Sequence, residues 1–399
     1  MPPDEADVVV VGAGYTGLSA ARTLARSGAS VVVLEREEAG WGASGRNGGF
    51  VLPGFKPGVA ELVRRRGRAQ ARALFARSME AVGFLEALVA EERIACDYVR
   101  CGAVTLADRA SHLADLERER RALLEVAGHE TRILDRTEIR SEIGSKRFSG
   151  GLLDPAAGSL QPAKYCAGLA RAAERAGARL AEHTEVLGIR RGAGRFEVAT
   201  SRGPVRAREV LVATNGYTGP PFHRLRRRVV PIGSHIVATA PLEPALAAKL
   251  IPGGRVLSDT RHLLHYFRLS PDRRILFGGR ASFMPIGTAR CATLLGDAMR
   301  RVFPELASTP VDFAWSGNVC FTRDRMPHAG LLDGLHYALG YCGHGVAYST
   351  WLGARVGERL GGGRELPEES RLKAVPLYGG RPWFLPLIGA YYRLRDWMS

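Results

Sequence analysis

Apolar residues follow one another in short unbroken runs near the start of the chain. The runs at 7–11 and in SVVVLE, which ends at Glu35, are rich in valine and predict strands buried on both faces, as in a parallel sheet. Between them, LSAARTLARSG has helical spacing and ends at Gly28. The start of the chain therefore predicts one strand–helix–strand unit.

After the first strand–helix–strand unit, helical and strand patterns no longer alternate regularly. The apolar spacing predicts a long helix over 59–92, a short strand over 102–108 and a charged helix over 112–128. The stretch 222–315 is rich in strand patterns and is interrupted by a helix over 290–303. We therefore predict an α/β protein (α+β overall), in which a Rossmann-like domain is interleaved with an antiparallel-sheet domain.

The places where the pattern of helices and strands changes give the expected domain boundaries. The cofactor domain takes residues 1–92, 150–221 and 316–368, and the substrate domain takes 93–149 and 222–315. Residues 369–399 form a tail with five apolar residues at helical spacing, namely Phe384, Leu387, Ile388, Tyr391 and Leu394. This spacing predicts a docked helix. Contact of this basic, aromatic helix with a membrane surface is the alternative, and it is too short and too rich in arginine to span a bilayer.

The net charge and the cysteine pattern limit the partners and the cellular compartment that we expect. The net charge is +16, but all but five of the 56 basic residues are arginines, and they are scattered. We therefore expect solvated helix faces and no nucleic-acid partner. The six cysteines form no C-x-x-C pair and no metal-binding pattern with histidine. Together with an acidic N-terminus that lacks the basic flank of a signal peptide, this predicts a reduced, cytoplasmic protein.

The turn after the first strand carries a dinucleotide-binding motif. VVVVGAGYTGLSAA matches G-x-G-x-x-G between a strand and a helix. Gly12 allows the tight turn, Gly14 lets a pyrophosphate approach the backbone, and Gly17 lets the helix lie close to the strand. The carboxylate of Glu35 can accept a hydrogen bond from a ribose hydroxyl and disfavours a 2′-phosphate, so FAD or NAD is preferred over NADP. Tyr15, Thr16 and Arg36 complete this part of the predicted cofactor site.

Five motifs in a fixed order resemble a known family. GAGYTGLSAA, GASGRNGG, LLDPAAGSLQP, ATNGYT and GYCGHGV occur along nearly the whole chain. This order is similar to that of the FAD-dependent D-amino-acid oxidase superfamily, in particular its γ-glutamylputrescine oxidase-like branch, for which ASGRNGG is the most specific piece. The resemblance implies that the cofactor is FAD and that the substrate is a small-molecule amine or amino acid.

The resemblance also implies which residues hold FAD. The loop after Glu35 would pass beside the flavin, where glycines leave room for a flat ring, Arg46 offsets phosphate charge and Asn47 reaches the ring edge. The residues of this loop are Ala43, Ser44, Arg46, Asn47, Gly48 and Gly49. The adenosine half is assigned to Val186, Ala213, Thr214 and Gly216, and the flavin end to a helix start formed by Gly343, His344, Gly345 and Val346.

Amine oxidation by hydride transfer to flavin needs few catalytic side chains. The products would be an imine and, with oxygen, hydrogen peroxide. In HYFRL, Tyr266 and Arg268 share one face of a predicted strand, and Arg280 follows two glycines in FGGR. Tyr266, Arg268 and Arg280 are the candidates for the substrate wall above the flavin. The position of Arg280 resembles one where related amine oxidases hold a substrate-binding side chain, and an arginine there suits a substrate carboxylate. His344 is the third catalytic candidate, although it is more often a spacer in this motif than a base.

Two positions depart from the pattern of some relatives. Gly317 stands where a cysteine attaches FAD in those relatives, and Cys320 is out of register, so we predict non-covalent FAD beside Gly317. The strand RILFGGR lacks the lysine that some relatives use to speed the reaction with oxygen. A flavin dehydrogenase that passes electrons to a quinone or carrier is therefore the alternative to an oxidase. An RNA-modifying flavoprotein is the further alternative, because the chain is basic.

Overall fold

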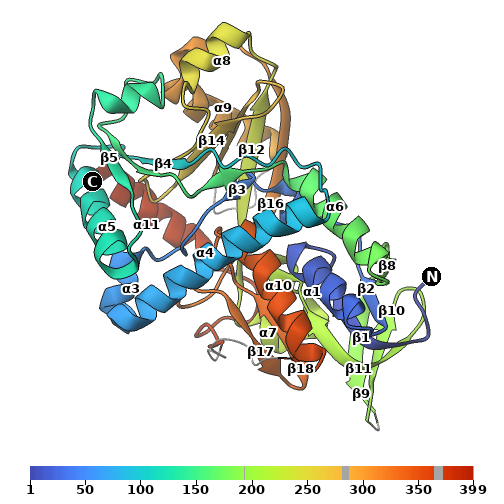
Figure 1. Ribbon diagram of the computed structural model, residues 1–399. Coiled ribbons are helices and arrows are strands. Elements are labelled where there is room, and N and C mark those ends of the chain that lie inside the picture. The colour runs from blue at the N-terminus through green and yellow to red at the C-terminus, as the bar shows by residue number, and fades with distance from the viewer. Residues whose placement is uncertain (193, 281–286, 364–371, 399) are drawn as a thin grey trace.

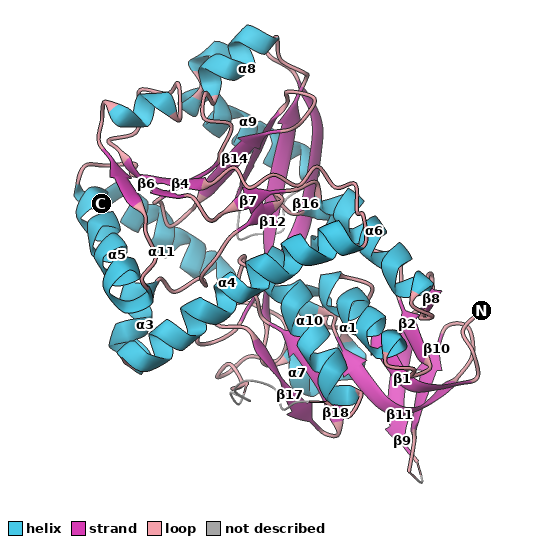
Figure 2. Ribbon diagram, viewed as in Figure 1, coloured by secondary structure: helices cyan, strands magenta, loops and turns pink. Residues whose placement is uncertain are grey.

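The structure is a computed structural model that describes residues 1–399 except 193, 281–286, 364–371 and 399. Two large sheets, one above the other in Figure 1, carry helices on their faces, and the two chain ends lie on opposite sides of the molecule (Figures 1 and 2). The predicted α/β class with two interleaved sheets is confirmed. The predicted boundary between residues 368 and 369 lies outside the described residues.

The first sheet contains the motif-bearing strands. Its order is β17-β18-β11-β1-β2-β8, and β10 and β9 extend it from β11. Strand β1 pairs in parallel with β2 and β11, so that Val9 lies between Val32 and Val210. The strands are β1 (Glu5–Val11), β2 (Val31–Leu34), β8 (Arg179–Ala181), β9 (Val186–Arg191), β10 (Phe196–Thr200), β11 (Val205–Val212), β17 (His328–Leu332) and β18 (Leu335–Leu339).

Helices α1 (Tyr15–Arg26) and α10 (Val346–Leu360) lie side by side on one face of this sheet (Figure 1). Glycine makes their close approach possible, because a Cβ on Gly353 would overlap the carbonyl of Thr16. Helix α4 (Arg68–Glu91) crosses the molecule in front of them, and α6 (Pro162–Arg175) packs beside α1. This layer brings the N-termini of α1 and α10 to the same edge of the sheet.

The second sheet has the order β16-β12-β15-β14-β13-β4-β6-β5 and is antiparallel except for the pair β13–β4. Its core includes the stacked rings of Phe267 and Phe277, whose centroids are 5.2 Å apart. The strands are β16 (Val311–Phe321), β12 (Val230–Thr239), β15 (Ile275–Gly279), β14 (His265–Leu269), β13 (Val256–Asp259), β4 (Ala103–Leu106), β6 (Gly151–Asp154) and β5 (Arg132–Leu134). Its helices are α5 (Ser111–Ala127), α8 (Pro244–Leu250) and α9 (Thr288–Val302).

Short elements connect the two sheets. They are the strand pair β3 (Phe50–Val51) and β7 (Gly158–Ser159), the helices α2 (Ala43–Arg46), α3 (Val59–Arg66) and α7 (His223–Arg226), and the 3-10 turns Asn215–Tyr217 and Pro220–Phe222. Two further 3-10 turns, Glu138–Ser141 and Pro304–Leu306, lie between elements of the second sheet.

Two expectations from the sequence need correction. The helix predicted over 59–92 is two helices, α3 and α4, because Gly67 between them adopts φ of +82° and ends the first. Strands β6 and β16 pair within the second sheet, so residues 151–154 and 316–321 do not belong to the first sheet, where the predicted boundaries placed them. The other domain boundaries stay predictions.

The tail ends in helix α11 (Leu385–Met398), which docks on the second sheet. Leu385, Ile388 and Tyr392 pack in a cluster with Val230 and Ile232 of β12. At the far end of the helix, the carboxylate of Asp396 accepts hydrogen bonds from the amides of His262 and Leu263, at 2.8 and 3.0 Å. Among the described residues, none of the helices is long and apolar enough to cross a membrane.

Candidate cofactor and active site

A long cleft opens at the carboxyl ends of β1, β2 and β11, where nucleotide sites of doubly wound sheets lie. It consists of two pockets that share Gly14, Ala43, Ser44, Ala213 and Asn215. The first pocket reaches to the end of β2, and the second reaches to the start of α10. One elongated ligand can therefore run past the N-termini of both helices.

Most predicted cofactor residues line this cleft. Those in the lining are Gly12, Gly14, Tyr15, Thr16, Glu35, Arg36, Ala43, Ser44, Asn47, Val186, Ala213, Thr214, Gly343, Gly345 and Val346. Those outside the lining are Gly17, Arg46, Gly48, Gly49, Gly216, Gly317 and His344. For both groups, direct contact with FAD stays a prediction.

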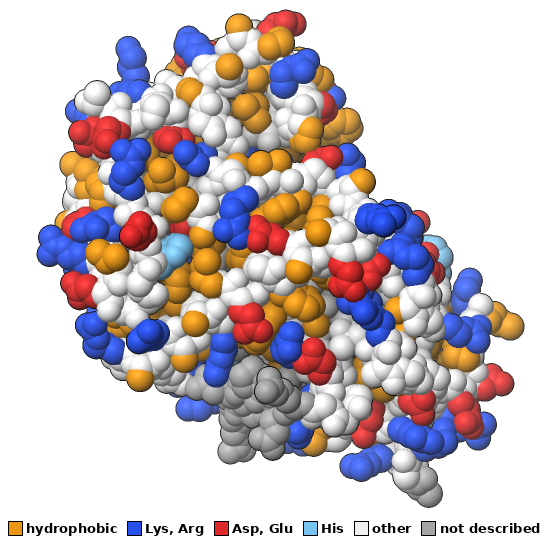
Figure 3. All heavy atoms as spheres, viewed as in Figure 1, with side chains coloured by type: hydrophobic (Ala, Val, Ile, Leu, Met, Phe, Trp, Pro, Cys, Tyr) orange, Lys and Arg blue, Asp and Glu red, His pale blue; other side chains and the backbone are white. Residues whose placement is uncertain are grey.

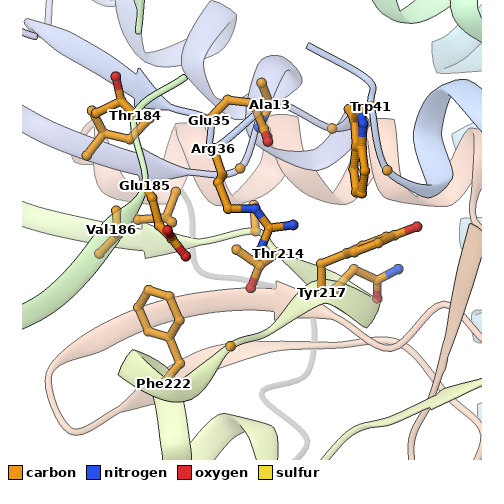
Figure 4. A pocket seen from close by; sticks show the side chains of 18 of the residues that line it. Ala13, Glu35, Arg36, Trp41, Thr184, Glu185, Val186, Thr214, Tyr217 and Phe222 are labelled. Atoms are coloured by element: carbon orange, nitrogen blue, oxygen red, sulfur yellow. The ribbon is translucent and has the colours of Figure 1, made fainter. Parts of the chain in front are cut away.

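Glu35 is fixed at the ribose end of the cleft. Its Oε2 accepts from the amide of Ala13 at 2.8 Å and its Oε1 from the amide of Glu37 at 3.0 Å. Each carboxylate oxygen keeps a free lone pair, so the group can still accept from a ribose hydroxyl. Figure 4 shows this pocket, with Arg36 extending into it between the strands.

The start of α1 forms a cradle in the middle of the cleft. Gly12 adopts φ of +104°, which a residue with a side chain would adopt only with strain. A Cβ on Gly14 would come 2.8 Å from Oγ of Ser44, the atom that accepts from the amide of Tyr15 at 3.1 Å. The absence of side chains leaves backbone amides and a helix N-terminus facing the cleft, which fits a pyrophosphate.

An aromatic pair at the first pocket was missed by sequence reasoning. The rings of Trp41 and Tyr217 meet edge to face with centroids 5.8 Å apart, and both line the pocket (Figure 4). Trp41 stands between Gly40 and Gly42, and Tyr217 directly follows the predicted ATNG turn. The pattern of an aromatic residue between glycines was the available signal.

Asn47 organises its own loop. Its Nδ2 lies 3.0 and 2.9 Å from the carbonyls of Ala43 and Ser44, and its Oδ1 accepts from the amide of Gly49 at 2.8 Å. The amide side chain therefore closes the short helix α2 while it lines the second pocket. The predicted hydrogen bond to the flavin edge would compete with these contacts.

Arg46 and the paired glycines lie on the other side of that loop. The guanidinium of Arg46 lies 4.3 Å from the centre of the Trp41 ring and donates to the carbonyl of Ser316 at 3.4 Å. A Cβ on Gly48 would come 2.9 Å from the ring of Tyr266, and one on Gly49 would overlap the carbonyl of Leu160. In this arrangement the glycines make room for the protein's own groups.

Gly216 and Gly317 lie where the 215–217 turn and the 43–47 loop meet β16. A Cβ on Gly216 would come 2.8 Å from the carbonyl of Asn318, and one on Gly317 would come 3.6 Å from Cα of Ala43. Both positions are therefore close junctions between the 43–47 loop, the 215–217 turn and β16.

His344 stands at the start of α10 but is not part of the lining of either pocket. Burial, and then the positive charge of Lys56, lower the pKa of His344 to about 3. Its Nδ1 is buried and finds no hydrogen-bond partner among the described residues. Such a histidine is neutral at physiological pH and is poorly matched to the work of a general base.

The candidate substrate wall comes from the second sheet. Tyr266 lies over Gly48 and Gly278 with its hydroxyl 3.0 Å from Oγ of Ser234, and burial raises its pKa. Arg280 lies 4.9 Å from the centre of the Phe321 ring, and burial lowers its pKa. Both side chains are therefore held in a desolvated region, as substrate-orienting groups require.

Arg268 serves neither as a surface residue nor at the substrate wall. It is 5% exposed and donates to the carbonyls of Gly48 at 2.7 Å and Leu160 at 2.9 Å. The arginine thereby connects the loop that contains Gly48 to the segment before α6 that contains Leu160. We assign it a structural role.

Lys56 joins this region from a segment that the sequence did not connect with it. The adjacent Phe55 packs on Tyr348 of α10 with centroids 4.9 Å apart, which brings the lysine to the start of α10. Burial, followed by the positive charges of Arg280 and Arg325, lowers the pKa of Lys56 to about 8. Among the described residues, no hydrogen bond or ion pair holds its ammonium. A lysine therefore lies near the start of α10, although not on the strand RILFGGR.

Comparisons with known proteins agree with this geometry. Residues 7–359 match the family described as FAD dependent oxidoreductase (DAO). The chain is 35% identical over 396 residues to Gamma-glutamylputrescine oxidoreductase from Escherichia coli, covering 98% of this chain and 92% of that protein. It is also 35% identical over 385 residues to Probable oxidoreductase OrdL from Haemophilus influenzae, covering 95% of this chain and 88% of that protein.

Solved structures show the same fold. Glycine oxidase from Geobacillus kaustophilus superposes with a TM-score of 0.79 at 21% identity, covering 94% of this chain and all (100%) of that one. Iminodiacetate oxidase from Chelativorans sp. superposes with a TM-score of 0.73 at 22% identity, covering 92% of this chain and 98% of that one.

Proposed function

Because this chain belongs to the FAD-dependent oxidoreductase (DAO) family, we propose that it oxidises the C–N bond of an amine or amino acid to an imine. The observation that carries the proposal is the continuous cleft between the N-termini of α1 and α10, with Tyr266, Arg280 and Lys56 clustered beyond its second end. FAD, when bound, accepts the hydride that leaves the carbon next to nitrogen.

The residues of the cleft have separate tasks in this proposal. Glu35 binds the ribose, and the backbone around Gly14 and Ser44 binds the pyrophosphate. The first-turn amides of α10, beside Gly345, stabilise negative charge that develops at the pyrimidine end of the flavin. No side chain needs to remove a proton from carbon, which agrees with a neutral His344.

Arg280 and Tyr266 orient the substrate. A guanidinium in a desolvated region binds a carboxylate strongly, so we expect a substrate that carries an acidic group apart from its amine. The name of the Escherichia coli relative specifies an amine of this kind. Arg280→Lys is expected to raise KM for such a substrate by about tenfold, because the bidentate geometry is lost.

A substrate panel tests the proposal directly. Amines and amino acids, with and without a carboxylate, are mixed with purified enzyme, and flavin bleaching is followed without oxygen and peroxide with oxygen. We expect bleaching by at least one carboxylate-bearing amine. A purified protein without flavin absorption, or a yellow protein that no amine bleaches, would contradict it.

Oxygen is the electron acceptor that the site favours. Lys56 places a positive charge near the flavin end, and such a charge favours electron transfer to oxygen because reduced oxygen is an anion. Transfer to a quinone or carrier remains the second candidate. Fast dye reduction together with slow reoxidation in air would decide for that candidate.

We propose that FAD is held without a covalent bond. Burial raises the pKa of Cys320 well above its ordinary value, which keeps the thiol protonated and unreactive. Acid precipitation should therefore release all of the flavin into the supernatant. Flavin that stays with the pellet would contradict this.

The RNA-modifying alternative has less support. On the face in Figure 3 acidic and basic side chains are interspersed, without a continuous basic groove. Many arginines elsewhere pair with acids, as Arg100 does with Glu86 and Arg255 with Glu142. Binding to RNA at physiological salt would revive this alternative.

A further inference from the structure

Helix α11 has a second apolar face that the body of the protein does not cover. Leu387, Tyr391 and Leu394 lie on one side of the helix at spacings of four and three residues, and they are 68%, 54% and 53% exposed. Trp383, just before the helix, is 62% exposed. We call these four residues the outer face.

The direction of the outer face is fixed by the opposite side of the helix. Leu385, Ile388 and Tyr392 pack against β12, and the carboxylate of Asp396 binds the amides of residues 262 and 263. Arg109 also donates to the carbonyl of Asp396 at 3.0 Å. With one side held at both ends, the helix cannot rotate to bury its outer face.

The charged residues of the tail itself are mostly basic. Residues 372–399 contain one acidic residue, Asp396, and four basic ones, Lys373, Arg381, Arg393 and Arg395. Asp396 is the residue that docks the helix, so its charge is already used. Arg381, Arg393 and Arg395 are exposed and flank the apolar residues.

An apolar strip with an indole at one end and arginines along its sides suits the boundary between lipid headgroups and acyl chains. The arginines would meet anionic headgroups while Leu387 and Leu394 enter the apolar layer. A second copy of the chain fits less well, because a two-fold contact through the outer face would gather the arginines of both tails in one interface, while Asp396, the one acidic residue of 372–399, already docks the helix. The charge complementarity therefore selects an anionic lipid surface.

We propose that the outer face of α11 is a docking surface for membranes that contain anionic lipids. The helix would lie on the surface of the bilayer and would not cross it. The proposal is independent of the substrate, because it concerns a segment beyond residue 359, where the match to the family ends.

Vesicle sedimentation with the full-length FAD enzyme tests the proposal. The probes are vesicles of phosphatidylcholine alone and vesicles that also contain phosphatidylglycerol. We expect binding to the mixed vesicles that is about tenfold tighter than to the neutral ones and that weakens with salt. The double variant Leu387→Glu/Leu394→Glu should lose about tenfold of this binding or more.

A matched control separates the outer face from a general effect of added charge. Leu124 and Leu331 are 45% and 57% exposed and belong to α5 and β17, outside the outer face. Leu124→Glu/Leu331→Glu should bind mixed vesicles much more tightly than the outer-face variant. The flavin spectrum and the melting temperature show whether each variant is folded.

Three results would overturn the proposal. The first is no binding of the wild type to either kind of vesicle. The second is an equal loss of binding in both double variants. The third is a dimer in light scattering that only the outer-face variant abolishes, without vesicle binding, which would assign the face to self-association.

Discussion

At the scale of single residues, the first turn of α1 leaves no room for a side chain at Gly17. A Cβ there would overlap the carbonyl oxygen of Gly12 and come 3.1 Å from Cγ1 of Val10. Neither neighbour can move without displacing the turn that holds the pyrophosphate. Gly17 therefore acts on the cofactor through the backbone, although it lies outside the lining of the cleft.

Gly17→Val is expected to destabilise the fold by about 3 kcal/mol and to yield protein without FAD, because the overpacked turn must move. Flavin absorbance per protein and thermal unfolding measure both effects. Gly83→Ala is the control, since a Cβ at Gly83 in α4 meets nothing within 4 Å. The control should keep FAD and gain up to about 1 kcal/mol from helix propensity. Full FAD content in Gly17→Val would contradict the assignment of this turn.

The role that we propose for Lys56 predicts a pH dependence for the reaction with oxygen. With a pKa of about 8, its ammonium is charged below that pH and loses its charge as the pH rises through it. Reoxidation of the reduced enzyme by oxygen should therefore slow above about pH 8, whereas reduction of a dye should not. Stopped-flow reoxidation on both sides of this pH measures the step.

Two variants isolate the lysine. Lys56→Met should slow the reaction with oxygen by about tenfold at neutral pH and remove the step, because the charge is absent at every pH. Lys164→Met, which removes a surface lysine paired with Asp97 at 2.8 Å, should keep both the rate and the step. An unchanged pH profile in Lys56→Met would rule out this role.

At the scale of elements, the strand–helix–strand start could be read from the sequence because its strands are unbroken valine runs and its glycines have fixed spacing. The break between α3 and α4 at Gly67 could not be predicted, because the apolar spacing continues through it and only the positive φ of Gly67 ends α3. The sequence also did not predict that Lys56 lies near the start of α10, since 288 positions of the chain separate residues 56 and 344. Tertiary packing alone brings such residues together.

Asn47 shows the same limit within one loop. Its residue type fits a flavin contact and a loop closure equally well. The hydrogen bonds to Ala43, Ser44 and Gly49 show the closure, whereas the flavin contact stays a prediction. Trp41 and Tyr217 belong to separate segments, so their ring contact has no local signal. Side-chain partners are thus less predictable than the elements that carry them.

The docking of α11 should weaken at low pH. Burial raises the pKa of Asp396. The hydrogen bonds from the amides of Leu263 and His262 and from the ring of His262 lower it by more than burial raises it, so the net pKa is below its ordinary value of 3.8. The stabilisation is therefore complete above pH 3.8 and is lost as the pH falls through the lower folded-state pKa.

Asp396→Asn is expected to weaken docking at neutral pH by about 2 kcal/mol, because the amides lose a charged acceptor. Limited proteolysis should then cleave the tail while the rest of the chain and its FAD remain. A proteolysis rate equal to that of the wild type would show that the apolar contacts of Leu385, Ile388 and Tyr392 are sufficient for docking.

At the scale of the whole molecule, the first sheet is assembled from three distant parts of the chain. Strands β1 and β2 come from its beginning, β8 to β11 from its middle, and β17, β18 and α10 from its last quarter. The second sheet fills the intervals between them. This interleaving places the candidate substrate wall against the candidate cofactor cleft.

The interleaving sets the time at which the protein can acquire FAD during its synthesis. A ribosome releases the chain from the N-terminus, so the Gly12–Gly17 turn emerges long before α10, which forms the other end of the cleft. A nascent chain arrested at residue 327 lacks β17, β18 and α10 and should bind no FAD, whereas one that exposes residues 1–363 should bind it. Until then the valine strands β1 and β2 lack part of their sheet. We therefore expect chaperones to hold this chain until nearly all of it has been made.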